Sequence, residues 1–232
     1  MQPLQLNPNR KTTVIPVQEE SAHLLVVDNL LVNPEEIVLF ARNTAYMQPA
    51  INDGTAYPGI RDRVPTAYEK MMQALVSDLA LVSDDQTLSI HRCMLSMVTT
   101  PPDQLASTQK IPHIDSIDPY EFASVHYLFD ADYGGTNIYR HKQSQKVCID
   151  EAGFGIFQSS LEDVRANPDE FSGYIGDSNR LFECVHHIEA KFNRLVIYKG
   201  NMLHSPCIKP NFGFSDDVTK GRLSVASFFR ID

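Results

Sequence analysis

The run "TLSIHRCMLSMVTT" at residues 87–100 marks the point where the chain changes character. From here to the C-terminus, short β-prone segments are separated by Gly, Pro, Asn and Asp. Many short strands with turn residues between them are typical of an antiparallel sandwich or barrel. The segments are "TLSIHRCMLSMVTT", "FASVHYLF", "GGTNIYRH", "VCIDEAGFGIFQ", "LFECVHHIE", "RLVIYKGN" and "RLSVASFFRI". We predict a mainly β fold with α: a jelly roll (double-stranded β-helix) over residues 87–232, with a helical or loop insertion at 159–180.

Upstream of this run the pattern is mainly helical. After a polar lead-in over residues 1–20, an apolar strand at 24–27 precedes a helix start, with Asn33 as N-cap and Pro34 at the first helical position. Apolar residues at helical spacing in "TAYEKMMQALVSDLALV" predict a second helix. We expect residues 1–86 to form an N-terminal strand and supporting helices, within a single domain that spans the chain.

Length and composition exclude several classes of protein. With 232 residues, 43% hydrophobic and 21% charged, the chain can bury one substantial core. The formal net charge of −9 provides no basic surface, which argues against a nucleic-acid partner. The four cysteines form no CxxC pair, so reduced thiols are expected. No signal peptide and no run of about 18 apolar residues occurs, so we expect no membrane partner and a cytoplasmic location.

A candidate metal site begins in "IPHIDSIDPY", residues 111–120, which we interpret as a strand running into a turn. His113 and Asp115 are two positions apart, and side chains at this spacing in a strand face the same side. The pair alone is weak evidence, because chance places such residues two apart in many chains. His204, after the apolar strand in "RLVIYKGNMLHSP", is the candidate third ligand. Two imidazoles and one carboxylate form a facial triad that leaves positions open on iron(II).

The last β-prone segment adds a candidate anion clamp. Arg222 and Ser224 share a strand face, and a guanidinium can hold a carboxylate by two charge-assisted hydrogen bonds while the hydroxyl adds a third. The pair looks like a clamp for 2-oxoglutarate. It lies 18 residues after His204, so the segment at 205–220 must return the chain to the same sheet for the clamp to form.

Together, H-x-D at His113 and Asp115, the distal His204 and "RLS" at 222–224 resemble the iron(II)/2-oxoglutarate-dependent dioxygenases. The run "VHYLFDADYGGTNIYRH" is similar to their prolyl-hydroxylase-like branch, and "VVDNLLVNPEEIVLFA" is similar to the N-terminal part of uncharacterised bacterial members. The resemblance covers residues from about 87 to 232.

The resemblance implies a set of ligands and roles. Fe(II) would be bound by the triad, and O2 and 2-oxoglutarate would be co-substrates, with Arg222, Ser224 and Tyr127 contacting the latter. The reaction would oxidise a C–H bond of a small molecule or an amino-acid side chain. Halogenating relatives lack the carboxylate ligand, so the presence of Asp115 favours hydroxylation or a related oxidation.

Other residues have more than one interpretation. Tyr57 and Arg61, in the loop "AYPGIRDR", are candidate substrate contacts, because loops near a barrel mouth often bind substrate. Neighbouring strand residues face opposite sides, so only one of His126 and Tyr127 faces the interior, and we favour Tyr127. By the same rule His186 and His187 diverge, and we expect structural roles for them. The glycine pair at 134–135 is expected to form a turn, because no phosphate-binding pattern surrounds it.

Two other functions stay open. A cupin-type jelly-roll metalloprotein would use its metal without 2-oxoglutarate, but such a site has no need of Arg222 and Ser224. A non-catalytic binding module could keep the fold, but loss of a metal ligand is the simplest route to inactivity, and the triad is intact.

Overall fold

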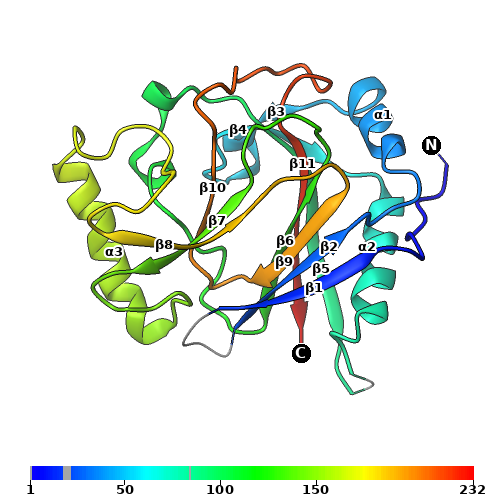
Figure 1. The fold of residues 1–232 in the computed structure, drawn as a ribbon, viewed down its shortest axis with the longest axis horizontal. Helices are drawn as coiled ribbons and strands as arrows, with labels where there is room; N and C mark the ends of the chain where they lie inside the picture. The colour runs from blue at the N-terminus through cyan, green and yellow to red at the C-terminus, as the bar shows by residue number, and fades with distance from the viewer. Residues whose placement is uncertain (1, 18–21, 84) are drawn as a thin grey trace.

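A computed structural model describes residues 2–17, 22–83 and 85–232, and within them eight strands form one antiparallel sheet (Figure 1). The strand order is β1-β2-β9-β6-β11-β5-β4-β3, so strands distant in sequence lie side by side. Their bounds are β1 Lys11–Pro16, β2 His23–Asp28, β3 Gln48–Pro49, β4 Gly59–Arg63, β5 Leu88–Val98, β6 Glu121–Tyr127, β9 Arg194–Lys199 and β11 Leu223–Ile231.

A second sheet contains three of the described strands, in the order β10-β7-β8. Their bounds are β7 Thr136–His141, β8 Phe182–Ile188 and β10 His204–Pro206. On the other edge of β10, His113 forms an isolated antiparallel bridge with His204. This sheet therefore ends at a pair of histidines.

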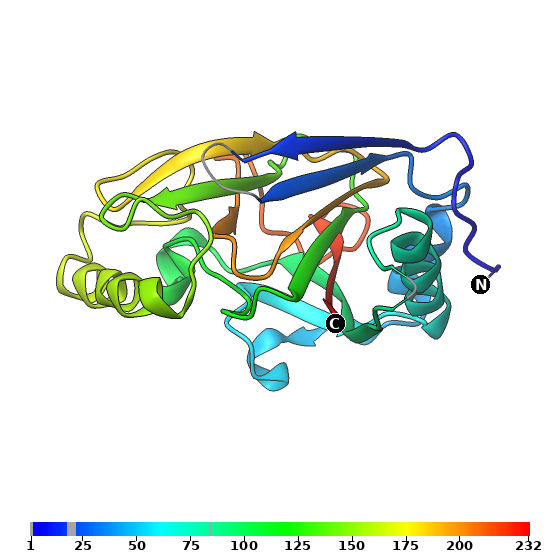
Figure 2. The same ribbon diagram turned by 90° about the horizontal axis from the view of Figure 1, so that it is seen from below.

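Helices cover the outer faces of both sheets (Figures 1 and 2). Helices α1 (Glu35–Asn43) and α2 (Thr66–Asp78) pack on the large sheet, where Met72 and Leu75 are fully buried. Burial of each such side chain contributes about 1.5–3 kcal/mol. Helix α3 (Glu151–Ala166) packs against the small sheet, and short 3-10 turns lie at η1 Ala50–Asp53, η2 Pro102–Gln104 and η3 Ser107–Gln109. Among the described residues, no helix is long and apolar enough to cross a membrane.

A separate apolar cluster lies between the sheets. The large sheet contributes Val26, Ala123, Tyr127 and Val196, and the small sheet contributes Ile138 and Ile188. Inward and outward side chains alternate along each strand, so this inner cluster and the outer cluster under α1 and α2 share the same strands. The predicted jelly roll is confirmed, because six of the seven β-prone segments form strands of these two sheets.

The seventh segment, "VCIDEAGFGIFQ", is where the strand prediction is wrong. Helix α3 begins there at Glu151, with the Asp150 carboxylate accepting a hydrogen bond from the Gly153 N–H at 2.8 Å. The helix therefore starts well before the insertion predicted at 159–180. Phe157, Leu161 and Val164 face the small sheet at helical spacing, and this packing overrides the β propensity of Phe and Ile.

The N-terminal part also differs from the prediction, which made it mainly helical. It contributes β1 to β4 to the large sheet, and the predicted loop "AYPGIRDR" contains β4, which pairs with β5. Asn33 does not cap α1 with its side chain, because its Oδ1 accepts from the Gln5 N–H at 3.2 Å. Residues 1 and 18–20 of the predicted polar lead-in lie outside the described residues.

Candidate metal centre

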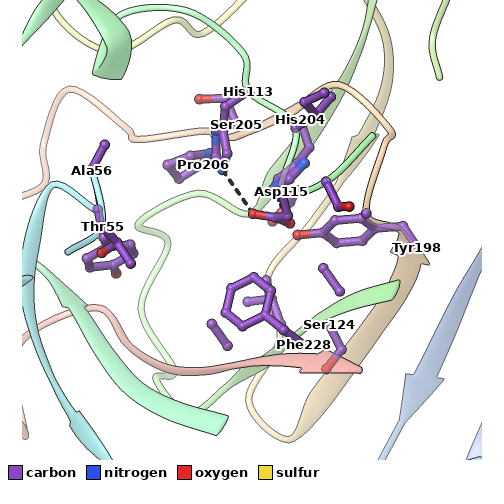
Figure 3. A pocket seen from close by; sticks show the side chains of 18 of the residues that line it. Thr55, Ala56, His113, Asp115, Ser124, Tyr198, His204, Ser205, Pro206 and Phe228 are labelled. Carbon is purple, nitrogen blue, oxygen red and sulfur yellow. Dashed lines mark ion pairs between the residues drawn. The ribbon is translucent and has the colours of Figure 1, made fainter. Parts of the chain in front are cut away.

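His113, Asp115 and His204 come together at one end of the space between the sheets (Figure 3). Each offers one ligand atom, and these atoms lie within 4.8 Å of one another. The Asp115 carboxylate lies 3.8 Å from Nε2 of His113 and 3.5 Å from Nε2 of His204. Atoms that share one ion at about 2.0–2.2 Å lie roughly 3–4 Å apart, so the set needs little movement to bind a metal.

Backbone hydrogen bonds hold the three ligands together. The N–H of each histidine donates to the carbonyl of the other, at 2.9 and 3.0 Å, and the Asp115 N–H donates to the Gly200 carbonyl at 2.8 Å. The stretch at 111–120 is thus an isolated bridge rather than the predicted strand. Its pairing still directs His113 and Asp115 to the same side.

The protonation of the site suits a cation. Nδ1–H of His204 donates to the Met202 carbonyl at 2.9 Å, which fixes the ring so that Nε2 faces Asp115 and is the nitrogen that can bind a metal. Desolvation, with the nearby charges of His204 and Arg61, lowers the pKa of His113 well below its usual value. Desolvation also raises the pKa of Asp115, against the opposing effect of His204 and Arg61. Neutral imidazoles are metal ligands, and a bound cation would favour the ionised carboxylate.

The triad opens into a cavity of about 780 Å³ lined from both sheets (Figure 3). The segment at 205–220 does return the chain to the large sheet, because β11 pairs with both β5 and β6. Arg222 and Ser224 therefore line the same cavity as the candidate metal ligands. The lining also includes Tyr57, Arg61, Arg92, Val125, Thr136, Tyr198 and Phe228.

Arg222 is buried and held from several sides. Its Nε donates to the Gly134 carbonyl at 3.2 Å and its Nη2 to the Gly135 carbonyl at 2.7 Å. The guanidinium carbon lies 5.7 Å from the ring centroid of Tyr127 and 5.4 Å from that of Phe129. Among the described residues, Nη1 has no hydrogen-bond partner. The cation is thus fixed at the cavity with one nitrogen left for a ligand.

Tyr127 and His126 face opposite sides of β6, as predicted. Tyr127 lies on the inner side, where its hydroxyl is 2.6 Å from Oγ1 of Thr136, which lines the cavity. Its own side chain lies behind the cavity wall, against Arg222. His126 lies on the outer side, with Nδ1 3.3 Å from the hydroxyl of Tyr68 on α2. The structure therefore gives Tyr127 a supporting contact with Arg222 rather than a place in the cavity wall.

The glycine pair that accepts from Arg222 is sterically required. A Cβ on Gly135 would lie 1.8 Å from the Ile188 carbonyl oxygen, and one on Gly134 would lie 1.8 Å from that of Cys207. The glycine pair, directly before β7, thus brings two carbonyls against the arginine.

We expect Gly135→Ala to lower the free energy of unfolding by more than about 1–3 kcal/mol, the usual cost of overpacking, because backbone atoms would have to move. Gly155→Ala in α3 is the matched control, since its Cβ would meet no atom within 4 Å. That change should stabilise by about 0.5–1 kcal/mol. Urea unfolding of both variants measures the difference, and equal stabilities would contradict the close approach at Gly135.

The remaining predicted positions divide into two groups. Tyr57 and Arg61 do lie in the cavity wall, although on the approach to β4 and on β4 itself. His187 lies elsewhere, with its Nδ1 2.6 Å from Oδ1 of Asn137. The sequence analysis missed Tyr198, whose ring centroid lies 4.6 Å from that of His204. Strand alternation with the inward Val196 was the signal that could have revealed it.

The jelly-roll fold is similar to that of a protein solved with 2-oxoglutarate bound. HygX from Streptomyces hygroscopicus, solved with nickel, 2-oxoglutarate and hygromycin B bound, superposes with a TM-score of 0.53 at 9% identity, covering 89% of this chain and 82% of HygX. SnoN, a non-haem α-ketoglutarate-dependent epimerase from nogalamycin biosynthesis, gives a TM-score of 0.44 at 11% identity, covering 89% of this chain and 76% of SnoN. The likeness of fold rests on HygX.

The sequence itself places the chain in a family. Residues 8–229 match the model of a family of unknown function, DUF6445, and the protein belongs to that family. No curated protein matches the sequence.

Proposed function

We propose that this protein is an iron(II)- and 2-oxoglutarate-dependent dioxygenase that hydroxylates or otherwise oxidises a C–H bond of a small molecule or an amino-acid side chain. The observation that carries the proposal is the shared cavity, in which a two-histidine, one-carboxylate triad lies with a buried, partly unpaired arginine. Such a triad leaves metal positions open for a chelating co-substrate and O2.

The residues fit this metal and this co-substrate. Two imidazoles and a carboxylate suit Fe(II), and the unpaired Nη1 of Arg222 suits the far carboxylate of 2-oxoglutarate. Ser224 lies in the same wall, where its Oγ is 3.3 Å from the Ser96 carbonyl. The likeness to HygX, which was solved with 2-oxoglutarate bound, supports the assignment.

The chain's residues have distinct roles in this function. His113, Asp115 and His204 hold the metal, Arg222 orients the co-substrate, and Tyr127 supports Arg222 from behind. Bound iron(II) supplies, with O2 and 2-oxoglutarate, the oxidising chemistry that gives succinate, CO2 and an oxidised substrate. The cavity volume of about 780 Å³ lies within the range of small-molecule sites, roughly 300–1,000 Å³. The retained carboxylate of Asp115 favours hydroxylation over halogenation.

The finer assignments stay predictions. Membership of the prolyl-hydroxylase-like branch and a cytoplasmic location rest on the sequence alone, and so does the expectation of no nucleic-acid or membrane partner. The cupin-type alternative remains the second candidate, because it uses the same triad without a co-substrate.

We expect the iron-loaded protein to convert 2-oxoglutarate to succinate slowly without substrate, with matching O2 consumption. Nickel in place of iron should stop this turnover, while the control Gly155→Ala should leave it unchanged, because Gly155 lies in α3 away from the cavity. Succinate formation is quantified directly, and an oxygen electrode measures the consumption of O2. Metal binding without any interaction with 2-oxoglutarate would favour the cupin-type function, and absence of metal binding would favour a non-catalytic module.

A further inference from the structure

A second polar cluster lies beside the metal centre, in the segment that leads into β4. Its buried side-chain atoms without a hydrogen-bond partner among the described residues are Asp53 Oδ2, Tyr57 Oη and Arg61 Nε. Tyr57 and Arg61 both line the cavity. A buried polar group without a partner is unfavourable, so the two of these atoms that belong to cavity-lining residues, Tyr57 Oη and Arg61 Nε, indicate a site completed by a ligand.

Arg61 presents one complete edge to such a ligand. Its side chain is only 7% exposed, and Nη1 donates to Oγ1 of Thr55 at 3.2 Å. The Tyr57 ring covers one face of the guanidinium, 4.1 Å from the carbon to the ring centroid. The opposite edge, Nε and Nη2, has no partner in the described part of the chain. Two parallel N–H groups on one edge match the two oxygens of a carboxylate.

The charge of Arg61 is not neutralised by a hydrogen-bonded acid. Oδ2 of Asp53 lies 3.9 Å from Nη1, which is beyond hydrogen-bond distance. Burial lowers the pKa of Arg61, and an anion in the cavity would oppose this effect. Arg92, on β5, lines the same cavity and adds a second cation. This wall therefore favours a negatively charged group.

Arg61 and Arg222 are held by different parts of the chain, so each can bind an anion of its own. Arg222 follows the loop into β11 and is tethered to the glycine carbonyls, whereas Arg61 lies on β4 and is tethered to Thr55. With 2-oxoglutarate on Arg222, the unpaired edge of Arg61 is left for a second molecule. The apolar side of the cavity includes Phe228 and Val125, which lie on the inner face of the large sheet, and Phe228 points toward the triad in Figure 3.

We propose that the substrate of the oxidation is an organic acid, whose carboxylate is bound by the Nε–Nη2 edge of Arg61 and whose apolar part lies against Phe228 and Val125. This inference rests on the proposed function for the reaction, but the binding of an acid at Arg61 can be tested without turnover. It makes Arg61 the specificity-determining residue.

The test uses protein that is loaded with nickel and saturated with 2-oxoglutarate. Nickel in place of iron allows ligands to bind without turnover. The probes are a panel of aliphatic, aromatic and α-amino carboxylic acids, each paired with its primary amide, and calorimetry reads their affinities. We expect wild type to bind at least one acid about 30-fold or more tighter than its amide, the effect of losing one buried charge pair. Arg61→Gln should reduce that acid to the affinity of its amide while nickel and 2-oxoglutarate still bind.

Two further variants control for folding and for charge. Arg63→Gln removes an exposed arginine from the same strand and should bind the acid as wild type does. Arg61→Lys keeps the charge but not the two-pronged edge, so it should recover only part of the affinity. Thermal unfolding of each variant checks that the fold is retained.

The proposal is overturned if wild type binds acids and their amides with equal affinity, including when it binds neither. It is overturned as well if Arg61→Gln binds the acid as tightly as wild type does. It is also overturned if Arg61→Gln loses 2-oxoglutarate instead, since Arg61 would then hold the co-substrate. If wild type takes no 2-oxoglutarate, the proposed function fails, and the same acid–amide comparison on nickel-loaded protein alone still decides the role of Arg61.

Discussion

Asp115→Ala is expected to abolish iron-dependent turnover and to weaken divalent-metal binding by more than about 100-fold. Loss of groups that merely orient metal ligands typically costs about 10–100-fold, and Asp115 is itself a candidate ligand lying within 3.8 Å of both imidazole nitrogens. Without it, two neutral histidines provide no negative charge to the cation. Calorimetric titration with nickel or manganese, beside succinate formation with iron, measures both losses.

Asp118→Ala is the matched control for this variant. Asp118 lies on the same segment but forms an ion pair with Arg230 at the surface and does not line the cavity. The Asp118→Ala variant should therefore bind divalent metal with the affinity of the wild type. Both variants should keep the far-ultraviolet circular dichroism of the wild type, because the apolar clusters and the sheets do not depend on the site. A wild type that unfolds when the metal is removed would instead assign the triad a structural role.

Arg222→Ala is expected to weaken 2-oxoglutarate binding by about 30-fold to several thousand-fold, or roughly 2–5 kcal/mol. The far carboxylate would then lie in a desolvated pocket without its cation. Arg222→Lys should recover only part of the loss, because an ammonium cannot reproduce the directed guanidinium contacts. Titration of nickel-loaded protein with 2-oxoglutarate gives the affinities, and metal affinity should be unchanged.

A second compound separates the clamp from a loss of stability. Arg222 also bonds to the carbonyls of Gly134 and Gly135, so both variants should have lower melting temperatures. The probe 2-oxopentanoate has the chelating end of 2-oxoglutarate but lacks the far carboxylate. Wild type should strongly prefer 2-oxoglutarate over this probe, and Arg222→Ala should not. An unchanged preference in the variant would exclude the clamp and promote the cupin-type alternative.

The parts predictable from the sequence depend on short-range geometry. His113 and Asp115 could be paired because a two-residue spacing in extended chain fixes their relative direction, and the structure keeps that direction with a single bridge. The strands of the core could be recognised because they alternate with turn residues. His204 and Arg222 were found through their motif, because nothing local shows that distant strands meet.

The parts that sequence analysis missed depend on packing between distant segments. Strand β4 exists because it pairs with β5, and "AYPGIRDR" by itself has the composition of a loop. Helix α3 contains two glycines and β-prone residues, and its face is defined only by the small sheet beneath it. The unpaired edge of Arg61 could not be foreseen, since it depends on where Thr55 and Asp53 lie after folding.

The tethering of Arg222 has an entropic consequence. A free arginine side chain samples many rotamers, worth about 2 kcal/mol, and ordering it at the moment of ligand binding would subtract from affinity. Here the two glycine carbonyls and the rings of Tyr127 and Phe129 restrict those rotamers as the chain folds. A carboxylate that reaches Nη1 therefore meets a cation that is already immobile, so most of its contact energy is retained as affinity.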